Sequence, residues 1–418
     1  MRRPWAPRPA GEGNEAGEGS EAVPAAGGRL AGHMSHSVSV ATATVVPVYL
    51  TGGLAVQLGH DLGFPVASLG LAPAAFFGAA AVCSPLAGML TERIGPGPAM
   101  RAAVWTSVVV MLVAAVVVWN LTSLLILLAV AGAGNALAQP STNLFLAQRV
   151  PFRRQGTAYG VKQSAIPTAG LLAGLAVPFL GLTIGWRWAF ATMAVLAAVV
   201  AWRTPTGERR PRASAAERRE SGDASRGLLV VAAVAAGLAA ASGSALGIYL
   251  VAGAVHSGWS EATAGLLFAF ASTVGIAARL GSGLRADRRG RNHLGVVILM
   301  LVLGSIGFAL LVPSHRLLFA LGAPIAFGAG WGWPGLFILA VVQASPTAPA
   351  AATGLTQTGT SVGAVVGPVA FGLVVQHASF GMAWIAAGAA GLLAAAIFLL
   401  VRRPLGTTAP PLSQHVPI

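Results

Sequence analysis

The chain has little charge and almost no cysteine. Of its 418 residues, 9% are charged and 55% are hydrophobic. A water-soluble protein carries about 25% charged residues, so the composition predicts a polytopic membrane protein. The single cysteine, Cys83, excludes a disulfide or a multi-thiolate metal site within one chain. Because Cys83 lies in an apolar run, we expect it to be a small buried hydrophobic residue.

Acidic residues are missing from the apolar interior of the sequence. No apolar run holds a central carboxylate, a histidine pair or a cysteine pair, so we expect no enzyme, no cofactor and no metal site. A Gly-x-x-x-x-Gly-Lys motif is also missing, and an ATP-driven pump therefore has no support. The twelve acidic residues lie in the tails, in a central charged stretch or at the ends of apolar runs: Glu12, Glu15, Glu18, Glu21, Asp61, Glu92, Glu208, Glu217, Glu220, Asp223, Glu261 and Asp287.

Basic residues give the chain a net charge of +14, and their distribution explains that charge. Of the 25 arginines, 22 lie in the tails, in alternate loops or at the edges of those loops. This asymmetry follows the positive-inside rule and predicts that both termini are cytoplasmic, in the inner (plasma) membrane of a cell. Basic loops at a membrane edge need no nucleic-acid partner. We expect a lipid bilayer around a monomer, and no nucleic acid.

Twelve apolar runs have lengths suited to crossing a bilayer, which takes about 20 helical residues. They form two sets of six, separated by a charged linker at 204–226. We predict a disordered tail at 1–33, six-helix bundles at 34–203 and 227–402, and a polar tail at 403–418; Met34 is a candidate start of the chain. The predicted helices are 36–57, 67–90, 99–119, 121–147, 157–182, 186–203, 228–254, 261–285, 293–313, 317–343, 351–377 and 380–401.

One charged pattern occurs in both sets. Residues 88–95 read Gly-x-x-x-Glu-Arg-x-Gly, and residues 283–290 read Gly-x-x-x-Asp-Arg-x-Gly. Upstream, residues 63–71 repeat in 258–266 with the same offset. A long repeat in two halves of one chain is typical of a duplicated fold.

This pattern resembles the loop that the major facilitator superfamily carries between helices two and three and again between helices eight and nine. The first copy departs from the family by having Glu92 in place of Asp and a Pro-Gly-Pro sequence at 96–98. The resemblance covers about residues 35–402. It implies an all-α membrane fold of two pseudo-symmetric six-helix halves and transport by alternating access. It also implies gating by Gly88, Glu92, Arg93, Gly283, Asp287 and Arg288.

The family resemblance assigns the two acids of the motif to a latch. Glu92 is expected to face the N-terminus of helix eleven, and Asp287 that of helix five, and so to stabilise an outward-open state. A carboxylate at a helix N-terminus contributes about 0.3–2 kcal/mol. Contacts of this size can bias one state and still break in each cycle. The alternative is a solvated turn that only contributes to the charge asymmetry. Gly88 and Gly283 are expected to allow close helix packing.

Two cations lie inside predicted spans. Lys162 is the only lysine, about five residues into the fifth helix, and Arg279 lies about six residues before the end of the eighth. Charges at membrane depth usually mark substrate or ion paths. Three interpretations stay open. The two cations form an anion site, in which Arg279 resembles the helix-eight arginine of monocarboxylate and oxalate transporters. Alternatively, Arg279 pairs with a helix end or with Asp287 as a structural gate, or Lys162 simply extends its ammonium group to the membrane surface.

Further polar and aromatic residues are candidates for the substrate site. Asn135, Gln139 and Asn143 follow one another at spacings of four and share a helix face. Each candidate also has a structural reading, as an interhelical hydrogen bond or a packing contact. The substrate-binding candidates are Lys162, Arg279, Gln163, Gln357, Asn135, Gln139, Tyr49, Tyr249 and Trp331.

We therefore predict a secondary active transporter for a small organic anion or a neutral metabolite, with proton coupling as one possible mode. Two alternatives remain: efflux of a bulky apolar compound, and a non-transporting nutrient sensor. The helix-four motif of multidrug-cation exporters is absent, since residues 130–135 are uncharged.

Overall fold

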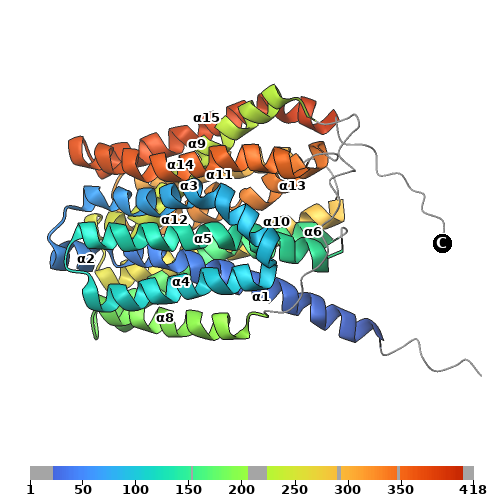
Figure 1. Cartoon of the computed structure of the whole chain (residues 1–418). Helices are drawn as coiled ribbons and strands as arrows, with labels where there is room; N and C mark the ends of the chain where they lie inside the picture. The colour runs from blue at the N-terminus through green and yellow to red at the C-terminus, as the bar shows by residue number, and fades with distance from the viewer. Residues whose placement is uncertain (1–21, 152–153, 206–223, 290–292, 346–348, 408–418) are drawn as a thin grey trace, which may run out of the picture.

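The computed structural model describes residues 22–151, 154–205, 224–289, 293–345 and 349–407. These residues form helices and short connections, with no strand among them. The long helices run side by side in one bundle (Figure 1). The predicted all-α class is confirmed. The predicted linker lies outside the described residues except for its ends, 204–205 and 224–226.

The elements before residue 206 are called the N-half. They are α1 (Ala22–Gly53), α2 (Ala55–Leu62), η1 (Val66–Gly70), α3 (Leu71–Ile94), α4 (Pro96–Val117), α5 (Leu121–Arg149), α6 (Gln155–Gln163), α7 (Ala165–Ala176), η3 (Val177–Gly181) and α8 (Trp186–Arg203). The elements after residue 223 are called the C-half. They are α9 (Arg226–His256), α10 (Glu261–Arg289), α11 (His293–Leu311), α12 (Arg316–Ile325), η5 (Ala326–Gly330), α13 (Pro334–Ala344), α14 (Pro349–His377) and α15 (Phe380–Thr407).

Ten helical segments of the described chain are long and apolar enough to cross a membrane. An eleventh is the pair α1 and α2, which is bent by 68°. The remaining predicted span is α8, which carries an arginine at each end of its apolar core and lies beside α4 and α1 (Figure 1). Three of the predicted spans are broken helices: α1–α2, α6–α7–η3 and α12–η5–α13.

Several helices extend beyond their predicted ends. α1 begins at Ala22, inside the stretch for which the composition predicts disorder. Extending an existing helix requires no new nucleation, and the added residues include good helix formers such as alanine and leucine. The charged motif is mostly helical as well, because α3 continues through Glu92 and Arg93 and ends only at Gly95, where φ is +89°.

The two ends of the bundle are packed differently. We call the end with Gly95 the motif end, and the end with the turns at Gly63, Gly185 and Gly258 the far end. At the far end, one buried apolar cluster joins both halves and includes Leu54 of the N-half. At the motif end, the buried cluster of the C-half is separate from the clusters of the N-half. The structure is therefore closed at the far end.

Glycines allow helices to cross at backbone contact distance. A Cβ at Gly363 of α14 would lie 1.9 Å from the Gly237 carbonyl oxygen of α9, whereas a Cβ at Gly354 would meet nothing within 4 Å. Gly354 and Gly363 both lie on α14, so adding the same side chain at each position isolates the effect of helix packing. Small residues permit this close approach in membrane bundles.

Gly363→Val is therefore expected to destabilise the bundle by roughly 1–3 kcal/mol or to prevent folding, because overpacking forces α9 and α14 apart. Gly354→Val carries the same change in helix propensity without the clash, so it is the matched control. Thermal unfolding in detergent, followed by circular dichroism, measures both. Equal melting temperatures for the two variants would contradict the packing argument.

Candidate functional site

Lys162 is held by neutral amide oxygens. It lies in the last turn of α6 and is 5% exposed. Its Nζ donates to Gln139 Oε1 at 3.0 Å and to Asn143 Oδ1 at 2.5 Å, both on α5. Gln139 and Asn143 are themselves exposed, so the ammonium lies just behind a polar, accessible face of α5. No carboxylate is among its partners in the described residues.

Arg279 connects the two halves through main-chain carbonyl groups. The side chain is 2% exposed and lies on α10. Nε and Nη2 donate to the Trp331 oxygen at 3.2 and 2.6 Å, and Nη1 donates to the Gln163 oxygen. The fixed fork of the guanidinium group suits this arrangement, since it offers several donors in one plane. Arg279 is thus a cross-link between α6 of the N-half and the η5–α13 break of the C-half.

Prolines explain why these carbonyl groups are free. In a regular helix, the Gln163 oxygen would accept from the nitrogen of residue 167, but that residue is proline and has no N–H. Trp331 follows η5, and the helix resumes only at Pro334, so its oxygen also lies at a break. Carbonyl groups at such breaks need partners inside a membrane protein, and Arg279 supplies them.

Glycines let α6 and α10 approach closely beside Arg279. A Cβ at Gly160 would lie 2.9 Å from the Arg279 oxygen, and a Cβ at Gly283 would lie 3.0 Å from the Gly156 oxygen. The second copy of the charged motif therefore packs as expected. Gly88, in the first copy, has nothing within 4 Å, so the expected close contact is absent there. Its neighbours Leu86 and Met89 are exposed, and α3 packs against α5 here through the buried Ala87 instead.

The other gating candidates stay untested as a latch. Glu92 and Arg93 are exposed in the last turn of α3, and Arg288 is exposed near the end of α10. The Asp287 side chain lies outside the described residues. The latch is expected in an outward-open state, whereas this structure is closed at the far end.

Two aromatic candidates meet the same helix in the interior. The Trp331 ring lies against Gly243 of α9, where an added Cβ would be 2.0 Å from its Cε3 atom. Tyr49 of α1 lies against Gly247, one turn further along α9, at 2.8 Å from an added Cβ. Both side chains are buried, so Tyr49 and Trp331 line the contact between halves near Arg279.

The remaining candidates lie elsewhere. Asn135 accepts from Thr44 at 3.1 Å and so joins α5 to α1 within the N-half. Tyr249 donates to the Ala67 oxygen at 3.0 Å and closes the far end. Gln357 is exposed on α14. The structure thus gathers Lys162 with Gln139, and Arg279 with Gln163 and Trp331, in two adjacent sites.

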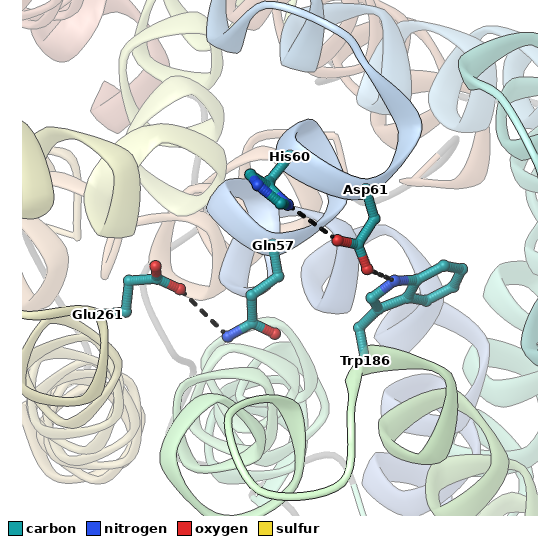
Figure 2. A network of polar contacts seen from close by, with 5 residues as sticks. All are labelled: Gln57, His60, Asp61, Trp186 and Glu261. Carbon is teal, nitrogen blue, oxygen red and sulfur yellow. Dashed lines mark hydrogen bonds and ion pairs between the residues drawn. The ribbon is translucent and has the colours of Figure 1, made fainter.

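A polar bridge at the far end was not among the sequence candidates. Gln57 of α2 donates to Glu261 of α10 at 3.3 Å, and so crosses between the halves (Figure 2). The two residues are 204 positions apart. Gln57 belongs to no recognised motif, and Glu261 lies in the repeated stretch 258–266, where the matching position of the first copy is valine. The signal that the sequence offered was that both residues lie at ends of predicted spans on the same side of the membrane.

A separate apolar cavity of about 210 Å³ lies within the N-half. Residues of α1, α4, α7 and α8 line it, among them Thr42, Met111, Leu172 and Met193. Its hydroxyl groups are engaged by the backbone: Thr168 donates to the Ser164 oxygen at 2.7 Å. The cavity can therefore accept an apolar group but offers little polar recognition.

Comparison with known proteins agrees with this architecture. A family model described as Major Facilitator Superfamily matches residues 38–311 and again residues 228–416. A comparison with curated proteins gave no match. The matches cover most of the chain, and the second begins close to the first residues of α9. The chain belongs to the major facilitator superfamily and is a multi-pass membrane transporter.

Proposed function

We propose that the protein is a secondary active transporter that moves a small organic anion by alternating access of its two halves. The observation that carries this proposal is the environment of Lys162. Its ammonium group is buried and contacts two neutral amide oxygens, so no negative charge among the described residues compensates it. A buried charge without a counter-ion is unfavourable. A substrate carboxylate or similar anion would supply the missing charge with a strong, charge-assisted hydrogen bond.

Arg279 has a different role in this proposal. Its three donors are engaged by main-chain oxygens of both halves, so it acts as a gate rather than as the first contact of the anion. Separation of α6 from α10 breaks its contact with Gln163 and exposes the guanidinium group. Because Lys162 directly precedes Gln163, anion binding at Lys162 can change the contact between Gln163 and Arg279.

The orientation follows from the distribution of arginine. The motif end carries the basic loops, and we propose that it faces the cytoplasm of a cell whose plasma membrane holds the protein. With this orientation, the far end, where one buried cluster joins both halves, faces outward. A neutral metabolite could use the same exposed amide face without the charge of Lys162.

The apolar cavity of the N-half supports a second candidate, efflux of a bulky apolar compound. Its lining is mainly aliphatic and includes Leu196, which is 50% exposed on the bundle surface. A compound entering from the bilayer would need no counter-charge. The two candidates differ in their dependence on Lys162, which does not line this cavity.

Lys162→Gln is expected to raise the KM for an anionic substrate by at least about tenfold, since about 1.4 kcal/mol of charge attraction is enough for that change. Lys162→Arg keeps the charge and should keep measurable transport. Uptake into proteoliposomes of a panel of mono- and dicarboxylates, with and without a pH gradient, measures both. Wild-type transport of every anion by Lys162→Gln would overturn the anion site.

Arg279→Lys is expected to lower the maximal transport rate several-fold with little change in KM, because a lysine cannot span both carbonyl groups with a planar fork. The same proteoliposome assay separates rate from KM. Arg279→Gln tests whether the charge matters further. A large rise in KM with an unchanged rate would instead assign Arg279 to the anion.

A further inference from the structure

The apolar cavity of the N-half lies beside a helix at the outside of the bundle. α8 forms one wall of this cavity, and Figure 1 shows α8 at the edge of the bundle next to α4. Its lining residues Met193, Leu196 and Val200 share one helix face and span seven residues, which is about 10 Å of helix. Because Leu196 is also 50% exposed, a hydrocarbon chain of the bilayer can reach the cavity without passing between the halves.

The hydroxyl groups of the cavity wall already donate to the backbone. Ser39 donates to the Ser35 oxygen at 2.9 Å, and Thr42 donates to the Ala165 oxygen at 3.5 Å. Thr168 is engaged in the same way. Among the described residues, no charged side chain lines the cavity. A polar guest would lose its hydration without replacement, so the cavity selects for hydrocarbon.

Every residue that lines the cavity belongs to the N-half. In the proposed alternating access, a cargo site lies between the halves, so that their rotation changes the side from which the site is reached. A cavity inside one half moves with that half as a unit, and its access stays the same. This placement favours a resident ligand over a transported one.

A positive charge lies one turn beyond the cavity on the same face of α8. Arg203 follows Val200 by three residues and Leu196 by seven, and it is exposed at the motif end. Its neighbour Trp202 is 77% exposed, as is typical of a tryptophan at the level of the lipid headgroups. Arginine binds phosphate with two parallel hydrogen bonds. A phospholipid with its phosphate group at Arg203 would therefore have its acyl chains beside Val200, where the cavity begins.

We propose that the N-half cavity binds one acyl chain of an anionic phospholipid from the leaflet at the motif end, and that Arg203 contacts the phosphate group. The lipid is a resident ligand and is not transported. Its chain fills the space between α7 and α8 and supports the wall of α7 just after the α6–α7 break, which carries Lys162 and Gln163. The site is separate from the proposed anion path and does not depend on the cargo.

Photolabelling in nanodiscs tests the site. The full-length protein is placed in phosphatidylcholine nanodiscs that contain a small fraction of phosphatidylglycerol with a diazirine group on one acyl chain. After illumination, mass spectrometry of peptides compares the labelling of α7 and α8 with that of α11. Leu299 and Leu303 of α11 are exposed, so α11 reports ordinary contact with the bilayer.

Labelling of α7 and α8 is expected to exceed that of α11 by at least about fivefold, which corresponds to about 1 kcal/mol of preference. Val200→Phe places a ring in the cavity and should reduce the labelling to the level of α11. Val199→Phe is the matched control, since Val199 is 45% exposed on the same helix and does not line the cavity. Leu172→Phe blocks the same space from α7 and replaces Val200→Phe if that variant does not fold.

The headgroup contact has its own control. Arg203→Gln is expected to lower labelling by the phosphatidylglycerol probe several-fold, because the phosphate loses its charged partner. Arg402→Gln changes an exposed arginine near the end of α15, the last helix of the C-half, and should leave the labelling of α7 and α8 unchanged. A phosphatidylcholine probe with the same diazirine chain should label the cavity less than the phosphatidylglycerol probe.

Equal labelling of α8 and α11, or full labelling in both Val200→Phe and Leu172→Phe, would overturn the chain site. Equal labelling by the two probes, unchanged in Arg203→Gln, would overturn the headgroup contact. Efflux of an apolar dye that Val200→Phe abolishes and Val199→Phe keeps would make the cavity a cargo path and would overturn the resident role. Labelling needs no transport, so a failure of anion uptake would reject only the proposed function.

Discussion

Neutral oxygen atoms hold the positive charges inside this bundle, and that constraint organises the interior. Lys162 is bound by side-chain amides, and Arg279 is bound by main-chain carbonyl groups. Neither arrangement neutralises the charge, so the interior stays electropositive where the halves meet. A bilayer protein tolerates such charges only where they serve a path or a contact between helices. In the proposed mechanism Lys162 belongs to the substrate path, and Arg279 forms the contact between helices.

Breaks in the backbone hydrogen bonding of two helices supply the carbonyl groups that Arg279 contacts. Pro167 leaves the Gln163 oxygen without a helical donor, and the break before Pro334 leaves the Trp331 oxygen in the same position. Arg279 can reach both oxygens because Gly160 and Gly283 bring α6 and α10 together. Removal of one component would leave the others with unsatisfied polar groups. Helix breaks, small residues and the buried arginine therefore act as one unit.

Much of the fold could be predicted from sequence. Hydrophobic run length and the repeated motif indicated the all-α class and the family, because both signals are periodic and long. Helix ends were less predictable: the acid and arginine of the motif continue α3, which stops only at Gly95. The spacing on α5 placed Gln139 and Asn143 on one helix face, but it did not predict that both would contact Lys162. The bridge from Gln57 to Glu261 could not be predicted, since it depends on how residues distant in sequence are packed.

The α6–α10 seam has a mechanical consequence. At Gly160 and Gly283 the two backbones touch with no side chain between them. A smooth contact of this kind lets one helix roll over the other without any interlocked groups having to disengage. On the opposite side of the motif end, α3 presents exposed apolar residues such as Val82 and Leu86. In the proposed alternating access, the seam serves as the axis about which the two halves rotate, and the largest displacement is expected between α3 and α14.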